Sequence, residues 1–426
     1  MDGWHRRPEA AGEALWCEGI RLSDIAEVVG TPLYVYSTLG VQRQFRAFAD
    51  AFAAWRPLIA YAVKANGNLS LLRTLAAEGA GADTVSEGEI RRALAAGIAP
   101  ERIVFSGVGK TEAELVFALG LRLASINVES EPELDRLATL AESRGGVPTI
   151  AIRVNPEVGA GGHAKITTGG AGTKFGVSLS EAERLYARAT AAPWLNPVGL
   201  ACHIGSQIGS LQPLEQAFIT LRGLVERLRA QGLAVSRLDL GGGLAAPTPE
   251  RPEPPAPADL AALVERTLGD LGVEFVFEPG RVIVADAGVL LSRVTHVHAR
   301  PDGRRFLVLD AGMNDLIRPA LYDAHHPLEP LSLRPGARTL AYDVVGPVCE
   351  TSDIFAHDER LPELRAGDLV AFRAAGAYSA TMTSEYNARP LAPEVLVDGD
   401  RWAVVRSRPS YDDMLAREPV APWLNR

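Results

Sequence analysis

The feature that most constrains the fold is a regular alternation of two sequence patterns between residues 40 and 290. Short apolar runs rich in Val, Ile, Leu and Ala alternate with stretches in which leucines recur every three to four residues. The first pattern predicts buried strands, and the second predicts helices that cover them. Eight strands are expected, at Ile59–Lys64, Gly81–Ser86, Arg102–Ser106, Ala124–Val128, Thr149–Asn155, Val198–His203, Ser236–Leu240 and Glu274–Phe277.

This alternation predicts the α/β class, with the eight strands closed into a parallel (β/α)8 barrel. An open, doubly wound sheet uses the same alternation and remains the rival architecture. After about residue 290 the long helical stretches disappear, which predicts a β-rich C-terminal domain. Its expected strands are Val289–Val297, Arg305–Leu309, Thr339–Val345, Asp368–Phe372 and Val395–Val397.

The N-terminal segment fits the β-rich part better than the barrel. Leu33–Tyr36 predicts a strand, and the turn Gly30–Pro32 precedes it. We therefore expect a barrel domain at residues 40–290, and a β-rich domain made of residues 1–39 and 291–426. Pro247–Pro257 predicts a non-helical surface loop after the seventh strand. Gly159–Gly176 fits a mobile lid and an ordinary surface loop equally well.

Charge and composition argue against several classes of partner. The net charge is −9 without a long basic run, which argues against nucleic acid and anionic membrane surfaces. No apolar run approaches the ~18 residues that span a bilayer, and the N-terminus lacks the hydrophobic core of an export signal. Cys17, Cys202 and Cys349 are widely spaced, without metal-type pairing. We expect a cytoplasmic protein without a metal site.

Polar residues gather where the predicted strands end. They are Lys64, Asp83, Ser106, Glu129, Asn155, His203, Gly241–Gly243, and Glu278 with Arg281. In a barrel these ends converge on one face, and buried polar groups there cost free energy unless they bind something. Each has an ordinary structural explanation alone, such as a lysine that reaches solvent or a tight glycine turn. Together they offer an amine, a phosphate cradle, an aromatic ring and a carboxylate, which pyridoxal phosphate can use.

Six segments resemble, in order, the motifs of the barrel-type pyridoxal-phosphate decarboxylases, and most closely those that act on diaminopimelate. The segments are Tyr61–Asn66, His203–Gln207, Gly241–Leu244, Glu278–Arg281, Gly346–Glu350 and Gly376–Tyr378. The resemblance implies a barrel followed by a β domain, with pyridoxal 5'-phosphate as cofactor and a small-molecule amino acid as substrate. It also implies a homodimer whose active sites lie at the subunit interface.

The resemblance assigns the cofactor-binding residues. Lys64 matches the Schiff-base lysine, and Asp83 resembles an acid close to that amine. Glu278 matches the carboxylate that keeps the pyridine nitrogen protonated, which makes the ring a strong electron sink. His203 resembles the residue that stacks on the cofactor ring. The implied phosphate site consists of Ser206, Gly241, Gly242, Gly243, Gly280 and Arg281, with Tyr378 contacting both phosphate and substrate.

The remaining assignments concern the reaction and the substrate. Cys349 matches the group that returns a proton after CO2 leaves, so the implied catalytic residues are Lys64, His203, Glu278 and Cys349. Diaminopimelate carries a second amino-acid centre, which needs a cation and an acid. The implied substrate residues are Arg281 and Arg318 for the distal carboxylate, Glu350 for the ammonium, and Tyr322 and Tyr378 around the pocket.

Three alternatives stay open. One is decarboxylation of ornithine, lysine or a D-amino acid. Arg318 distinguishes this alternative, because a substrate that is a diamine precursor has no distal carboxylate for it to bind. A second is an amino-acid racemase on the same barrel, which Glu278 disfavours because racemases work better with a weaker electron sink. The third is a non-catalytic protein that binds pyridoxal phosphate. The residues around Gly159–His163 and Ala380–Thr381 depart from the commonest family pattern, as does the proline-rich loop.

Overall fold

The computed structural model describes residues 3–10, 12–161, 164–170, 172–248 and 252–424 of the chain. The chain forms two compact units. One consists of Val41–Val284, and the other combines Met1–Gly40 with Ala285–Arg426. Within the described ranges, no helix combines the length and the apolar character that a bilayer crossing requires.

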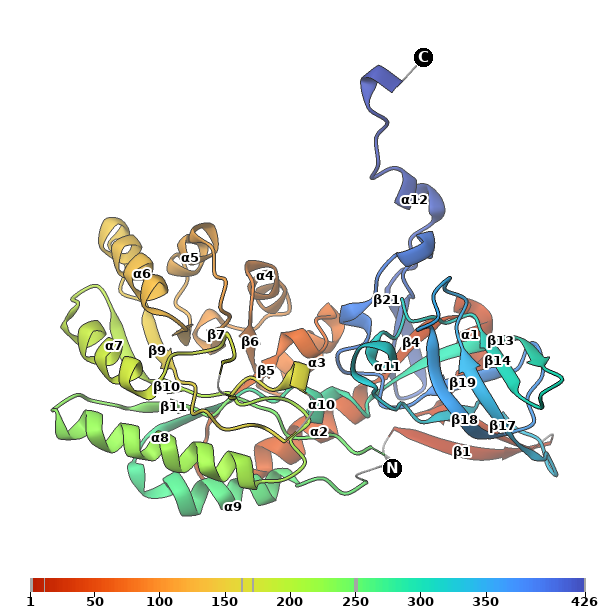
Figure 1. Cartoon of the computed structure of the whole chain (residues 1–426), viewed down its shortest axis with the longest axis horizontal. Helices are drawn as coiled ribbons and strands as arrows, with labels where there is room; N and C mark the ends of the chain where they lie inside the picture. Colours follow the sequence, from red (N-terminus) through yellow and green to blue (C-terminus); the bar gives the residue numbers. More distant parts are fainter. Residues whose placement is uncertain (1–2, 11, 162–163, 171, 249–251, 425–426) are drawn as a thin grey trace. The chain divides into compact units, whose positions relative to one another are not determined.

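The first unit is a closed barrel of parallel strands with helices around it (Figure 1). This confirms the predicted (β/α)8 barrel, and the rival open sheet is wrong. The strands are β5 (Leu58–Ala62), β6 (Gly81–Thr84), β7 (Ile103–Phe105), β8 (Ser125–Val128), β9 (Thr149–Arg153), β10 (Asn196–Ala201), β11 (Arg237–Asp239) and β12 (Glu274–Phe277). Several of the predicted strands extend one or two residues too far at their carboxyl ends, because those residues already belong to the loops.

The barrel helices alternate with the strands in sequence order, and the first of them precedes β5. They are α2 (Thr38–Ala51), α3 (Leu69–Ala77), α4 (Glu87–Ala95), α5 (Glu112–Leu119), α6 (Glu131–Arg144), α7 (Leu179–Ala191), α8 (Gln212–Ala230), α9 (Pro257–Leu268) and α10 (Arg281–Val284). Each long helix has one apolar face, and α8 buries Leu214, Leu221 and Leu228 on it. The side chain of Ser178 begins α7 by accepting a hydrogen bond from the Glu181 amide. The apolar faces hold the helices against the strands, and the caps fix where the helices begin. The loops that connect strand to helix are therefore positioned at the strand ends.

The proline-rich segment differs from its prediction at one residue. Its described residues before position 257 are non-helical and lie between β11 and α9, as expected, while residues 249–251 lie outside the described part. Pro257, however, is the first residue of α9. A proline is tolerated there because the first helical N–H has no partner within the helix.

The second unit is built on a nine-stranded sheet with the order β18-β17-β14-β13-β4-β20-β21, to which β19 and β15 attach. The bounds are β4 (Leu33–Ser37), β13 (Gly288–Ala299), β14 (Arg305–Leu309), β15 (Leu328–Pro330), β17 (Thr339–Val345), β18 (Ile354–Pro362), β19 (Leu369–Phe372), β20 (Glu394–Asp398) and β21 (Arg401–Arg406). Strand β4 pairs antiparallel with β13 and parallel with β20. The prediction that the N-terminal strand joins the β-rich part is therefore confirmed.

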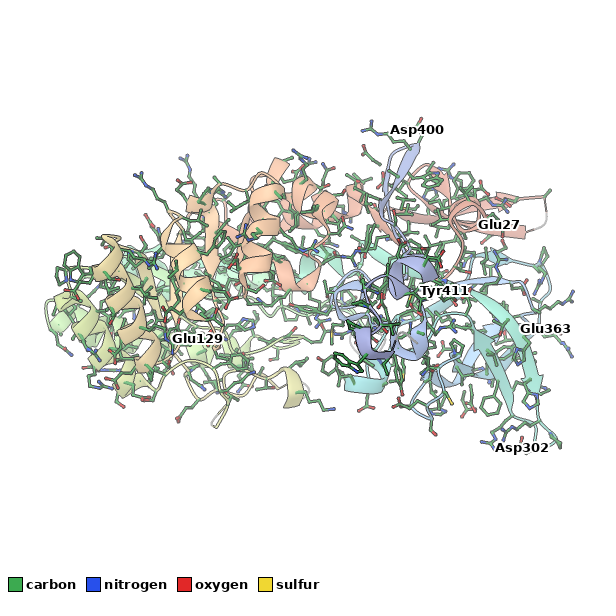
Figure 2. The ribbon with its side chains drawn as sticks, turned by 90° about the horizontal axis from the view of Figure 1, so that it is seen from above. Glu27, Glu129, Asp302, Glu363, Asp400 and Tyr411 are labelled. Atoms are coloured by element: carbon green, nitrogen blue, oxygen red, sulfur yellow. The ribbon has the colours of Figure 1, made fainter. Side chains whose placement is uncertain are left out.

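A smaller sheet completes this unit. It contains β1 (Trp4–Glu9), β2 (Gly12–Cys17), β3 (Ile20–Arg21) and β16 (Ser332–Leu333). Sequence analysis did not find β1, because its residues are mostly polar or charged and show no apolar alternation. Three short helices of the described chain also belong here, α1 (Leu22–Val29), α11 (Arg318–Tyr322) and α12 (Tyr411–Leu415). Asp302 and Asp400, which Figure 2 labels, lie in the turns between β13 and β14 and between β20 and β21.

Candidate active site

Lys64 lies in a 3-10 turn, Val63–Ala65, directly after β5. The predicted strand Ile59–Lys64 is wrong at its carboxyl end, because β5 ends at Ala62. The Ala62 amide donates to the Pro279 carbonyl at 3.0 Å. The Lys64 ammonium forms an ion pair with Asp83 on β6. The Asp83 side chain is fully buried, whereas that of Lys64 is 34% exposed. The amine therefore reaches the barrel mouth while a buried acid fixes its position.

Glu278 follows β12 and lies close to two other buried acids. Its Oε1 atom is buried and has no hydrogen-bond partner among the described residues, and the same holds for Oδ1 of Asp83. Burial raises the pKa of Glu278 well above its usual value, and the charges of Asp239 and Asp83 raise it further, while Lys64 opposes them. An unpartnered acid oxygen in such a place is costly unless a ligand donates to it.

Asp239, the last residue of β11, was missed as a site residue. Its Oδ1 accepts from the Gly241 amide and its Oδ2 from Nδ2 of Asn127, both at 3.0 Å. The available signal was an acid between two leucines in an otherwise apolar strand. The sequence analysis considered only residues at and after the predicted strand ends. Asp239 lay inside the predicted strand Ser236–Leu240 and was therefore not selected.

His203 is partly buried in the loop after β10. Its Nδ1 accepts a hydrogen bond from the Gly242 amide at 3.1 Å. Burial lowers the pKa of His203 well below its usual value, and the nearby charges of Arg153 and Lys64 lower it further. The imidazole is therefore neutral at physiological pH, with its proton on Nε2.

The three glycines after β11 are required by close backbone contacts. A Cβ atom at Gly242 would lie 2.1 Å from the Glu278 carbonyl oxygen. Gly241 and Gly243 have φ angles of +64° and +111°, which disfavour other residues. Within the described part of the chain, the amides of Gly241 and Gly242 already donate to Asp239 and His203, and no such bond engages the Gly243 amide. Gly243 is therefore the amide best suited to a phosphate.

A cationic position lies beside this glycine turn. Arg281, the first residue of α10, is buried, and its Nη2 donates to Ser206 Oγ at 3.1 Å. Gly280 precedes it, and its carbonyl accepts from the Ile283 amide at 3.1 Å. The loops after β10 and β12 thus bring a hydroxyl and a guanidinium together, as an anion site needs.

The segment Gly159–Gly176 is bonded to the loop after β10 in its described part. The Ser206 amide donates to the Ile166 carbonyl at 3.1 Å, and Thr168 Oγ1 donates to the His203 carbonyl at 2.8 Å. Residues 162, 163 and 171 lie outside the described part of the chain. This segment therefore lines the loop that carries His203, and its role as a mobile lid stays a prediction.

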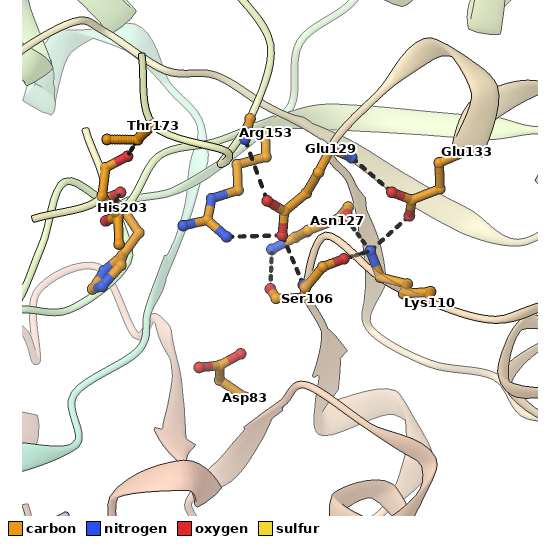
Figure 3. A network of polar contacts seen from close by, with 12 residues as sticks. Asp83, Ser106, Lys110, Asn127, Glu129, Glu133, Arg153, Thr173 and His203 are labelled. Carbon is orange, nitrogen blue, oxygen red and sulfur yellow. Dashed lines mark hydrogen bonds and ion pairs between the residues drawn. The ribbon is translucent and has the colours of Figure 1, made fainter. Parts of the chain in front are cut away.

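A polar network that the sequence did not reveal supports the barrel mouth (Figure 3). Lys110 Nζ donates to the Gly107 carbonyl, the Asn127 carbonyl and Glu133 Oε1 at 2.6–2.8 Å. Glu129, a polar strand-end residue, accepts from Arg153 at 2.8 Å and from the Gly107 amide at 2.7 Å. All three donors of Lys110 are thus used inside the protein, which identifies it as a structural lysine.

Arg318 and Tyr322 lie together in α11 of the β-rich unit. The Arg318 guanidinium is buried, 5.5 Å from the centre of the Tyr322 ring. Its Nε donates to Nε2 of His326 at 3.3 Å, and the His326 Nδ1 lies 3.1 Å from the Arg373 carbonyl. Arg318 is therefore not an ordinary surface arginine, because its guanidinium is buried and its direction is fixed by neighbouring side chains.

Cys349 and Glu350 lie in the loop between β17 and β18, and both are exposed. Asp353 shapes this loop by accepting from the Val348 and Met313 amides, both at 2.6 Å. The Cys349 amide donates to the Asn387 side chain at 2.9 Å. Hydrogen bonds from Ser352 and Tyr386 lower the pKa of Glu350 below its usual value.

Tyr378 belongs to the same unit and is partly buried, with a φ angle of +53°. The predicted site residues thus form two groups. The barrel holds Lys64, Asp83, His203, Ser206, Gly241, Gly242, Gly243, Glu278, Gly280 and Arg281, and the β-rich unit holds Arg318, Tyr322, Cys349, Glu350 and Tyr378. Their union in one site stays a prediction.

The family described as "Pyridoxal-dependent decarboxylase, pyridoxal binding domain" matches residues 39–285. This range includes the barrel and every predicted site residue in it. The fold and the barrel group thus define an enzyme of the pyridoxal-dependent decarboxylase class, with pyridoxal phosphate as its cofactor.

More specific relatives cover nearly the whole chain. A diaminopimelate decarboxylase of Zymomonas mobilis is 44% identical over 414 residues, which are 96% of this chain and 98% of the relative. The Helicobacter pylori diaminopimelate decarboxylase complexed with L-lysine has a TM-score of 0.89 at 40% identity, covering 93% of this chain and 98% of that one. The M. jannaschii enzyme in complex with L-lysine gives 0.93 at 32% identity, with both chains fully covered. The chain belongs to the diaminopimelate decarboxylase family.

Proposed function

We propose that this protein decarboxylates meso-2,6-diaminopimelate to L-lysine and CO2, the last step of lysine biosynthesis, with pyridoxal phosphate bound at the barrel mouth. The observation that carries the proposal is the Lys64–Asp83 ion pair, together with a buried Glu278 oxygen that has no hydrogen-bond partner among the described residues. Membership of the family supports the choice of substrate, as do the L-lysine complexes of two similar proteins.

The residues of the barrel mouth fit the cofactor. A protonated pyridine nitrogen offers Glu278 Oε1 the donor that this oxygen lacks among the described residues. The Gly243 amide, Ser206 and Arg281 offer donors suited to a phosphate. When bound, pyridoxal phosphate supplies an electron-poor ring that stabilises the negative charge left on carbon as CO2 departs.

Each barrel side chain then has a defined task. Lys64 provides the amine that holds the cofactor aldehyde covalently, and Asp83 fixes the direction of that amine. Glu278 keeps a proton on the ring nitrogen. The neutral His203 presents a flat ring without adding a positive charge, since the Gly242 amide fixes its tautomer. Tyr378 joins the phosphate group from the β-rich unit.

The β-rich unit supplies the recognition of the distal end of the substrate. Arg318, together with Arg281, binds the distal carboxylate, and Glu350 binds the distal ammonium. Tyr322 packs on the Arg318 guanidinium, 5.5 Å away, and limits the directions it can take. Cys349 donates its thiol proton to the carbon that has lost CO2.

The assembly that we propose is a homodimer in which Cys349 and Glu350 serve the site of the partner subunit. Their exposure supports this arrangement, because a proton donor and an ammonium ligand work best when shielded from water. Residues 40–290 then act as the cofactor domain, and residues 1–39 with 291–426 complete the site. The free cysteines Cys17, Cys202 and Cys349 are consistent with work in the reducing cytoplasm.

The direct test is CO2 release by the purified protein with added pyridoxal phosphate. Release from meso-diaminopimelate, and not from ornithine or lysine, supports the proposal, and Lys64→Ala must abolish it. Turnover of ornithine or lysine instead would retain the cofactor and reject the substrate. Cofactor binding without any CO2 release would reject catalysis and favour a binding protein.

A further inference from the structure

The barrel mouth is crowded with acidic groups. Asp83, Asp239 and Glu278 are 0%, 3% and 8% exposed. The charges of Asp83 and Asp239 act on Glu278, as does that of Lys64, which is ion-paired with Asp83. Holding three ionised carboxylates in one desolvated space beside one ammonium costs more free energy than keeping a proton between two of the acids.

Hydrogen bonds decide which acid holds the proton. Asp239 accepts from the Gly241 amide and from Asn127, and these bonds, with a side-chain hydrogen bond shared with Glu278, oppose the rise that burial causes in its pKa. Hydrogen bonds that a carboxyl group accepts favour its ionised form. The buried Oε1 of Glu278 accepts no hydrogen bond within the described structure, and burial, with the charges of Asp239 and Asp83, raises the pKa of Glu278 well above its usual value. The proton therefore belongs to Glu278.

Asn127 makes this arrangement directional. Its Nδ2 donates to Ser106 Oγ at 3.1 Å and to Asp239, while its Oδ1 accepts from Ser125 Oγ at 3.1 Å. Asn127 is 1% exposed, and Figure 3 shows it joined to Ser106 across neighbouring strands. The amide thus turns its NH2 group towards Asp239, and β7, β8 and β11 all contribute to holding that acid ionised.

We propose that Asp239 and Glu278 form a one-proton carboxyl pair that delivers its proton to the ring nitrogen of pyridoxal phosphate when the cofactor binds. Asp239, held by Asn127, is the positioning residue that keeps the proton on Glu278 until then. This inference rests on the proposed function, because it concerns the same cofactor site.

The transfer balances in atoms and charge. The O–H bond of Glu278 breaks, and its proton bonds to the lone pair of the ring nitrogen. The carboxyl pair changes from one negative charge to two, while the ring changes from neutral to singly positive. No proton has to enter the buried site from solvent. The ionised Glu278 then faces the N–H group that it created, which provides the missing donor for its oxygen.

The charged groups that face the pair favour this storage. Asp83, from β6, raises the pKa of both Asp239 and Glu278. Lys64, from the turn after β5, lowers the pKa of Glu278, but it is ion-paired with Asp83. His203, from the loop after β10, is neutral. Cofactor binding changes this balance by bringing a base, the ring nitrogen, that can accept the stored proton.

Calorimetric titration of the apo-protein with pyridoxal phosphate tests the proposal. At about pH 8, where a model glutamate is ionised, repeating the titration in buffers of different ionisation enthalpy counts the protons taken from solvent. The wild type draws none for the ring nitrogen. In Asp239→Asn, Glu278 has lost one of the charges that raise its pKa, so more of it is ionised beforehand and uptake rises by up to about one proton per site. Equal uptake in both proteins overturns the proposal.

A matched control lies on the same strand as Glu278. Glu274 begins β12 at the opposite end of the barrel, where it is exposed and ion-paired with Arg237 at 3.0 Å. Glu274→Gln removes one negative charge, as Asp239→Asn does, and must keep the wild-type proton count. A rise in Glu274→Gln equal to that in Asp239→Asn overturns the proposal, because the count then follows net charge alone.

A second measurement needs no Asp239 variant to fold. The infrared spectrum of the wild-type apo-protein at the same pH must contain the C=O stretch of a buried protonated carboxyl group, and this band must vanish when pyridoxal phosphate is added. Glu278→Gln must lack it. A wild-type spectrum without the band overturns the inference even if the protein binds cofactor and releases CO2. Failure of the wild type to bind pyridoxal phosphate overturns the proposed function together with the inference.

Discussion

The two groups of site residues are held in opposite ways. In the barrel, Asp83 and Glu278 are buried, and loops from different strands fix their neighbours through hydrogen bonds. In the β-rich unit, Cys349 and Glu350 are exposed. The Asn387 side chain accepts from the Cys349 amide, and Ser352 of the same loop donates to Glu350. The barrel residues of one chain therefore form a buried polar cluster by themselves, whereas Cys349, as the proposed proton donor, would need a cover that shields it from water.

The largest expected effect separates two lysines of the barrel. Lys64→Ala should abolish CO2 release and the absorbance of covalently bound cofactor, because it removes the amine proposed to hold the cofactor aldehyde. Lys110→Met should retain both. Radiometric CO2 release and the visible spectrum of the loaded protein measure these outcomes. Normal turnover by Lys64→Ala would contradict the barrel account.

Cys349 and Cys202 provide the matching comparison for the second group. Cys349→Ala should lower kcat about 10²- to 10⁴-fold, the range for loss of a general acid. Cys202 is buried, burial raises the pKa of its thiol to about 12, and Cys202→Ala should leave kcat within a few-fold of wild type. Steady-state kinetics on meso-diaminopimelate decides. Similar rates for the two variants would remove Cys349 from the reaction.

The buried ion pair of Lys110 predicts a stability effect without a direct chemical one. In the native protein, Lys110 Nζ lies 2.6 Å from Glu133 Oε1. Lys110→Met leaves the buried Glu133 carboxylate without this charge partner. Breaking such a pair costs about 3–5 kcal/mol. Urea unfolding of the apo-protein measures the loss, and Lys110→Met with Glu133→Gln should recover much of it. A variant as stable as wild type would show that the network of Figure 3 does little to hold the barrel mouth.

Arg318 tests the substrate rather than the cofactor. Arg318→Leu should lower kcat/KM for meso-diaminopimelate. The loss of transition-state stabilisation should be about 1.5–3 kcal/mol, the range for a hydrogen bond to a charged group. Cofactor affinity should stay unchanged. Arg300→Leu, which replaces an exposed arginine beside the Phe306 ring, is the control. If both variants behave alike, the distal carboxylate is bound elsewhere.

The smallest effect is a pH dependence of the apo-protein. The pKa of His203 is lowered in the folded state, so the unfolded chain binds more protons once the pH falls below the unfolded value of about 6.5. The stability that the neutral His203 keeps at higher pH is therefore lost as the pH falls through that value, by at most about 1.4 kcal/mol per pH unit. His203→Gln should reduce this slope, measured by urea unfolding between pH 5 and 7. An unchanged slope would show that His203 is not held neutral.

The sequence predicted the barrel well because strand pattern and helix pattern alternate without interruption. The same reasoning placed Lys64, His203 and Glu278 correctly at strand ends, since a polar residue after an apolar run is easily seen. It missed Asp239 and Asn127, whose side chains belong to strands and whose importance arises only from partners on other strands. It also missed β1, where polar residues form an edge strand that only its partner β2 reveals.

We propose that barrel residues of one subunit and Cys349 of its partner form one reaction centre. Mixing inactive Lys64→Ala with Cys349→Ala protein, after dissociation and reassembly, tests it most directly. Shared sites predict that mixed dimers regain one intact site each, so that activity returns to about a quarter of wild type. If Cys349 serves the barrel of its own chain, no mixture contains an intact site. Activity that stays at the level of the separate variants would contradict the claim.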